Sequence, residues 1–156
     1  MYFWANKKIM YHLVLNIHIW TSVLFMVISI VLSVMVTRGF FLKKELYGKT
    51  CIYLENSFIL LLYLGLILGF ILYFFMEPAN KYAIQSVAEV NRILSLRFWS
   101  IEHFSVMLFA LILAQIGKIF TSKSISHHAK FKYAMIYYGA ATIATLISLS
   151  FYLANR

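Results

Sequence analysis

The chain has 156 residues, of which 63% are hydrophobic and only 12% are charged, whereas about 25% of the residues in a typical soluble domain are charged. This composition excludes a soluble globular fold, and no segment outside the apolar stretches is long enough to build a core of its own. The net charge of +9 does not indicate nucleic-acid binding here, because basic residues beside membrane helices commonly set topology and contact anionic lipids.

Four apolar stretches predict four membrane-spanning helices, since about 20 apolar residues are needed to cross roughly 30 Å of hydrocarbon. The charge-free runs cover residues 9–37, 56–76, 103–117 and 133–155. The third run is short, so we extend it to 98–120, with the Lys118 side chain directed toward the lipid head groups. The sequence therefore predicts one all-α domain over residues 1–156, an integral membrane bundle of four transmembrane helices at about 10–37, 55–76, 98–120 and 132–153.

The first and second helices carry recognisable end and packing signals. The first apolar stretch is longer than the hydrophobic region of a signal peptide and lacks a small-residue cleavage site, so we expect it to be retained. Gly39 is predicted to end the first helix and Pro78 the second. Gly65 and Gly69 form a G-x-x-x-G pattern, which favours close packing of two helices, although a flat macrocycle could use the same space.

The basic residues predict a topology in the membrane. Those in or near the first and third loops are Arg38, Lys43, Lys44, Lys49, Lys118, Lys123, Lys130 and Lys132, and fewer lie on the other side. Because cytoplasmic loops carry an excess of Lys and Arg, we expect these loops inside and both termini outside. Lys7 and Lys8, close to the first helix, favour the opposite orientation.

Histidine supplies the candidate chemistry. His12, His127 and His128 lie at a helix mouth or in a basic loop, where a histidine needs no functional explanation. His18 and His103 lie within apolar stretches, where an ionisable side chain indicates a functional site. At 1.5 Å per residue, both are expected about 10 Å below the same membrane face.

This placement would allow His18 and His103 to bind one haem iron as axial ligands between the first and third helices. Arg97 could then pair with a haem propionate. A purely structural role, in which each imidazole hydrogen-bonds a neighbouring helix, stays open. Glu102 diverges from His103 by about 100° around the helix, so we do not expect it to be a metal ligand.

The segment 97–132 resembles a family of small four-helix bacterial membrane proteins labelled cytochrome b. The residues that carry the resemblance are Arg97 with Phe98, Glu102 with His103, Met107, Gly117 with Lys118, Ala129 with Lys130, Lys132, and the segment 68–74. The resemblance implies haem b and electron transfer. The chain departs from the family pattern at Ser22 and Val23, where the family has an Arg-Trp pair, and at Tyr63, where it has a histidine. The resemblance therefore does not extend to a second haem site.

Three functions are compatible with these patterns. The first is a b-type cytochrome that passes electrons between a quinol or another donor and a respiratory partner. The second is a cofactor-free accessory subunit that packs in the bilayer against a larger membrane complex. The third is an enzyme that handles haem or porphyrin, which nothing beyond the same histidines favours. The sequence contains no nucleophile constellation or phosphate-binding glycine loop, so we expect an electron-transfer or accessory subunit rather than a stand-alone enzyme. The lone Cys51 excludes an internal disulfide, and the lack of C-x-x-C-H excludes c-type haem attachment.

Overall fold

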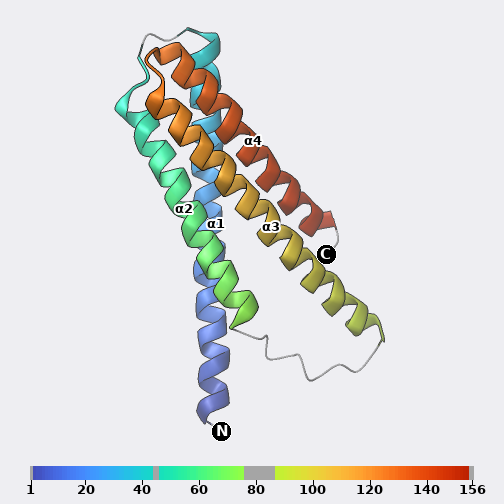
Figure 1. Ribbon diagram of the computed structural model, residues 1–156. Coiled ribbons are helices and arrows are strands. Elements are labelled where there is room, and N and C mark those ends of the chain that lie inside the picture. The colour runs from blue at the N-terminus through green and yellow to red at the C-terminus, as the bar shows by residue number, and fades with distance from the viewer. Residues whose placement is uncertain (1, 44–45, 76–86, 155–156) are drawn as a thin grey trace.

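The structure is a computed structural model that describes the backbone of residues 2–43, 46–75 and 87–154 and the side chains of residues 9–43, 46–75 and 101–151. The described chain forms four α-helices, namely α1 (Tyr2–Phe41), α2 (Lys49–Phe74), α3 (Val87–Lys123) and α4 (His127–Ala154) (Figure 1). Each contains a stretch that is long and apolar enough to cross a membrane. The prediction of an all-helical fold with four such helices is confirmed.

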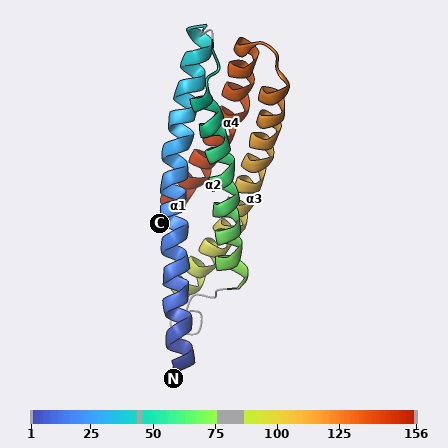
Figure 2. The same cartoon turned by 90° about the vertical axis from the view of Figure 1, so that its left-hand side faces the viewer.

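The helices run up and down in chain order, and each packs against its two neighbours around the bundle (Figures 1 and 2). Contacts join α1 to α2 and α4, and α3 to α2 and α4, so α1 and α3 lie diagonally opposite each other in the described chain. The α1–α2 and α3–α4 connections lie together at one end of the bundle (Figure 1). We call this end, formed by residues 41–43, 46–49 and 123–127, the loop end.

The helices begin earlier in the chain than the apolar runs predict, because charged and polar residues at the ends are accepted into the helices. α2 begins at Lys49 rather than near residue 55, and α3 begins at Val87 rather than near residue 98. Arg97 therefore lies within α3, but its side chain is outside the described residues, as is Pro78.

The bundle is apolar on its outside as well as in its core, where Phe58 and Leu62 are buried. Large apolar side chains cover the outside, as the Trp20 side chain does with 73% of its surface exposed. Polar side chains lie inside, where the buried ones are Ser29, Glu55, Thr121, Thr142, Thr145 and Ser148. This pattern suggests contact with lipid, because lipid solvates apolar side chains and leaves polar groups to find partners within the bundle.

Two glycines permit the closest helix contacts. A Cβ on Gly117 of α3 would lie 2.7 Å from the Cβ of Tyr137 on α4, and a Cβ on Gly39 of α1 would overlap the buried ring of Phe131. Gly39 does not end α1, which continues to Phe41, so that part of the prediction is wrong. Its role is to leave room for the Phe131 ring.

The Gly65–Gly69 pair does not mark a close approach of two helices, contrary to the prediction. A Cβ on Gly65 would meet nothing within 4 Å, and one on Gly69 would meet only Cε1 of His18 at 3.5 Å. The two glycines instead leave a smooth stretch of α2 beside the His18 ring.

We predict that Gly117→Ala destabilises the bundle by about 1–3 kcal/mol, because the Cβ of Tyr137 is fixed to the α4 backbone and cannot rotate away. Gly139→Ala in α4 is the matched control, since its new Cβ would meet nothing within 4 Å and alanine favours a helix by about 1 kcal/mol. Unfolding of both variants in detergent, followed by circular dichroism, makes the comparison. Equal stability of the two variants would contradict this account of α3–α4 packing.

Candidate functional site

One level of the bundle brings the two intramembrane histidines together with residues from the other two helices. His18 of α1 lies against α2, where its Cε1 would be 3.5 Å from a Cβ on Gly69. His103 of α3 lies against α4, where its Nδ1 is 2.9 Å from Oγ of Ser148. We call these four residues, one from each helix, the histidine layer.

Contacts between α2 and α3 place the two halves of this layer at the same level. Phe70, next to Gly69, and Phe104, next to His103, have ring centroids 6.3 Å apart. The imidazoles of the diagonal helices α1 and α3 thus lie at the same level of the bundle.

The two imidazoles differ in their hydrogen bonding. The Ser148 hydroxyl holds Nδ1 of His103, which fixes the orientation of the ring. The His18 ring lies near the Gly65 backbone, but its buried Nδ1 has no hydrogen-bond partner among the described residues. A buried polar atom without a partner destabilises a fold unless function retains it.

The other residues considered from the sequence lie elsewhere. His12 is exposed and contacts Tyr11 edge to face, with the ring centroids 5.7 Å apart. Glu102 is exposed. The Tyr63 hydroxyl of α2 accepts a hydrogen bond from Nε2 of Gln115 at 3.0 Å. Among the described side chains, no group of three His, Cys, Asp or Glu residues could hold a metal ion by itself.

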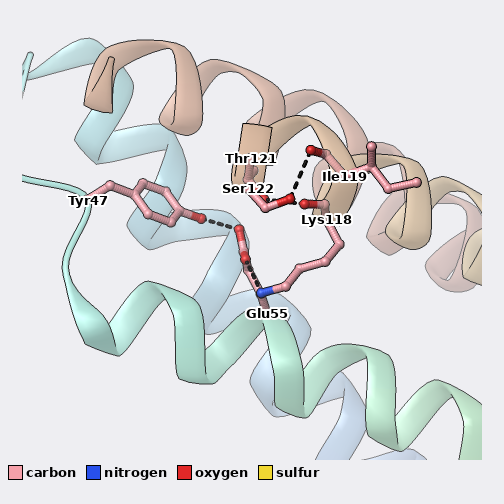
Figure 3. A network of polar contacts seen from close by, with 6 residues as sticks. All are labelled: Tyr47, Glu55, Lys118, Ile119, Thr121 and Ser122. Atoms are coloured by element: carbon pink, nitrogen blue, oxygen red, sulfur yellow. Dashed lines mark hydrogen bonds and ion pairs between the residues drawn. The ribbon is translucent and has the colours of Figure 1, made fainter. Parts of the chain in front are cut away.

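A second polar site lies nearer the loop end and surrounds a buried carboxylate (Figure 3). Glu55 of α2 is 1% exposed. Its Oε1 accepts a hydrogen bond from the Tyr47 hydroxyl, and its Oε2 accepts one from Nζ of Lys118 at 3.0 Å. We call Tyr47, Glu55 and Lys118 the carboxylate cluster. Lys118 pairs with Glu55 instead of extending to the head groups, so that part of the prediction is wrong.

The environment of Tyr47 keeps its hydroxyl protonated. Burial raises the pKa of this hydroxyl above its usual value, and the nearby charge of Glu55 raises it further. The hydroxyl is therefore a permanent donor to the carboxylate. Because Tyr47 lies between α1 and α2, this bond also fixes the loop.

His127 and His128, the first two residues of α4, help to hold the α1–α2 loop in place. The Tyr47 backbone N–H donates to Nδ1 of His127 at 3.2 Å. The ring of His128 stacks on Phe40, with centroids 4.8 Å apart and an interplanar angle of 19°. Both contacts tie the end of α1 and the α1–α2 loop to the start of α4.

The sequence analysis did not identify the carboxylate cluster. Glu55 directly precedes the charge-free run 56–76, so it was placed at the end of a span and not within one. The available signal was that Lys49, Glu55 and the five residues between them fit one continuous helix with the following apolar run.

Comparisons with known protein families, curated proteins and solved structures find no match to this chain.

We predict that Lys118→Met destabilises the protein by on the order of 3 kcal/mol, because it leaves the buried Glu55 carboxylate without its cation. Adding Glu55→Gln should recover part of this loss by removing the uncompensated charge. Lys123→Met, at the exposed end of the same helix, is the control and should change stability by less than about 0.5 kcal/mol. If the double variant is no more stable than Lys118→Met, the two side chains are not coupled as the geometry indicates.

Proposed function

We propose that this protein is a multi-pass membrane protein of the b-type cytochrome kind, which carries electrons in a respiratory chain. In this proposal His18 and His103 are the axial ligands of one haem b. The observation that carries the proposal is the histidine layer, in which one imidazole from each of two diagonal helices lies at the same level inside an apolar bundle.

The donor set fits a haem better than a free metal ion. A protein site for a bare ion needs three or four ligands, whereas a porphyrin supplies four nitrogens and needs only axial ligands from the protein. The histidine layer offers two imidazoles, and no group of three ligating side chains occurs among the described residues. Two histidines without further acidic or thiol ligands match the axial requirement.

The surroundings of the imidazoles support the same proposal. The Ser148 hydroxyl orients the His103 ring through Nδ1, and Nδ1 of His18 has no partner among the described residues. Gly65 and Gly69 keep α2 free of side chains next to His18. A flat macrocycle needs such a smooth helix surface.

The chain's own residues would orient the ligands and keep water away. A haem supplies reversible one-electron chemistry, and the protein sets its potential through the ligands, their hydrogen bonds and the exclusion of water. Ser148 would set the orientation of His103, and the apolar faces of the helices would exclude water. Arg97, earlier on α3, stays the proposed partner of a propionate.

The haem proposal predicts a sharp low-spin spectrum in the dithionite-reduced minus oxidised difference of the detergent-purified protein, expressed with haem available. His18→Ala and His103→Ala should each abolish the spectrum or convert it to a high-spin form, because each removes one axial ligand. His12→Ala is the control and should leave the spectrum unchanged, since His12 lies outside the histidine layer.

A colourless wild-type protein would contradict the haem proposal. That outcome would favour our second proposal, a cofactor-free accessory subunit of a larger membrane complex. The open space beside Gly65, where a Cβ would meet nothing within 4 Å, is the observation that favours it, because a helix of a partner subunit could pack there. Proteins that co-purify in mild detergent would then identify the complex.

We further propose that the loop end faces the cytoplasm, with both termini outside a bacterial inner membrane. Every Lys and Arg side chain that the structure describes lies at or near the loop end, and these are Arg38, Lys43, Lys49, Lys118, Lys123, Lys130 and Lys132. Of the two described acidic side chains, only Glu55 lies in that half of the bundle. This excess of positive charge favours the cytoplasmic side.

The topology proposal predicts that Ile125→Cys, at a position that is 99% exposed in the third loop, reacts with a membrane-impermeant maleimide only after the cells are opened. Arg156→Cys should react in intact cells. Both variants are made with Cys51→Ser, which removes the native thiol. The reverse pattern of labelling would contradict this orientation.

A further inference from the structure

A small cavity opens at the loop end beside the carboxylate cluster. It measures about 140 Å³, and its lining includes Ile52 of α2, Lys118, Thr121 and Ser122 of α3, and Lys130 of α4. The lining residues therefore come from three helices near the loop end.

The charges around the cavity favour an anion. Lys118 and Glu55 offset each other as an ion pair. Lys130 has no acidic partner among the described residues, so the lining has a net positive charge. A cation would be repelled by both ammonium groups, whereas an anion could bind Nζ of Lys130 and the free protons on Nζ of Lys118.

The hydroxyl groups of Thr121 and Ser122 in the lining already donate to backbone carbonyls. Oγ1 of Thr121 donates to the Lys118 carbonyl, and Oγ of Ser122 donates to the Ile119 carbonyl (Figure 3). These hydroxyls therefore do not supply donors for a ligand, and the two lysines carry the recognition.

The start of α2 adds to the positive potential. Its N-cap is Gly48, which makes no side-chain capping bond, and its first turn contains no acidic residue. A Cβ on Gly48 would meet nothing within 4 Å. The start of α2 thus lacks a side-chain cap, and an uncapped helix start attracts negative charge.

We propose that this cavity binds the phosphate of an anionic phospholipid head group. The inference rests on the proposed membrane location of the bundle. Basic pockets between membrane helices at the cytoplasmic side bind anionic head groups. Ile52 and Ile119, which are 41% and 50% exposed, lie on the helices that line the cavity and offer apolar surface to the acyl chains. A free phosphate would gain nothing from that surface, so the lipid is the favoured source of the anion.

The test measures binding of the first lipid to the full chain in neutral detergent by native mass spectrometry. Phosphatidylglycerol and phosphatidylcholine with the same acyl chains are titrated in parallel. We expect phosphatidylglycerol to bind wild-type protein more tightly. Lys130→Gln should weaken that binding about fivefold, as expected for loss of one lysine near the membrane surface. Lys132→Gln, which removes an exposed lysine outside the cavity lining, should leave it unchanged.

Two further arms keep the result interpretable. Lys130→Arg retains the charge and should retain the preference for phosphatidylglycerol, and circular dichroism checks that each variant is folded. Inorganic phosphate at the concentration of the lipid should not displace it. The proposal is overturned if wild-type protein binds both lipids equally, if Lys130→Gln and Lys132→Gln weaken binding equally, or if inorganic phosphate displaces the lipid. The readout needs no haem, so a colourless protein leaves this test intact, and a chain that stays soluble without detergent refutes the membrane location directly.

Discussion

The constraint on which this structure depends is that the outer surface of the bundle is apolar, so polar side chains have partners only inside the bundle or at its ends. Polar side chains gather at two interior levels of the bundle. One is the carboxylate cluster, where Glu55 is enclosed by Tyr47 and Lys118. The other is the histidine layer, where His103 bonds Ser148 and Nδ1 of His18 has no partner among the described residues. Glu55 pairs with Tyr47 and Lys118, whereas one nitrogen of His18 has no partner among the described residues. We therefore propose a structural role for the first level and cofactor binding for the second.

The carboxylate cluster and the histidine layer are separate sites in the same bundle. Glu55 and Gly69 are fourteen residues apart on α2, or about 21 Å along its axis. The carboxylate cluster joins the first loop, α2 and α3, and contacts of Tyr47 with His127 and of Phe40 with His128 tie the same loop region to α4. The loop end is therefore held by specific polar and ring contacts. The histidine layer contains the hydrogen bond between His103 and Ser148 and the buried Nδ1 of His18, which has no partner among the described residues.

Much of the fold followed from the sequence because crossing a bilayer imposes a length and a composition that are visible in one dimension. The four apolar runs located the four helices, and the depth count placed His18 and His103 at a similar level. Rotation of each helix about its axis is not encoded so directly. For that reason the Glu55–Lys118 pair, the Phe131 ring against Gly39 and the contact of Gly117 with Tyr137 were not predicted. Gly65 and Gly69 illustrate the same limit, since small residues at helical spacing can face a helix, a ring or open space.

The central claim is that His18 and His103 bind one haem between them. The most direct measurement is the electron paramagnetic resonance spectrum of the oxidised protein, purified after expression with haem available. Our account predicts a low-spin ferric signal that integrates to one spin per chain, because two imidazoles impose a strong axial field on a single iron. A high-spin signal would mean that at least one histidine is not a ligand. The absence of any haem signal from folded protein would contradict the claim.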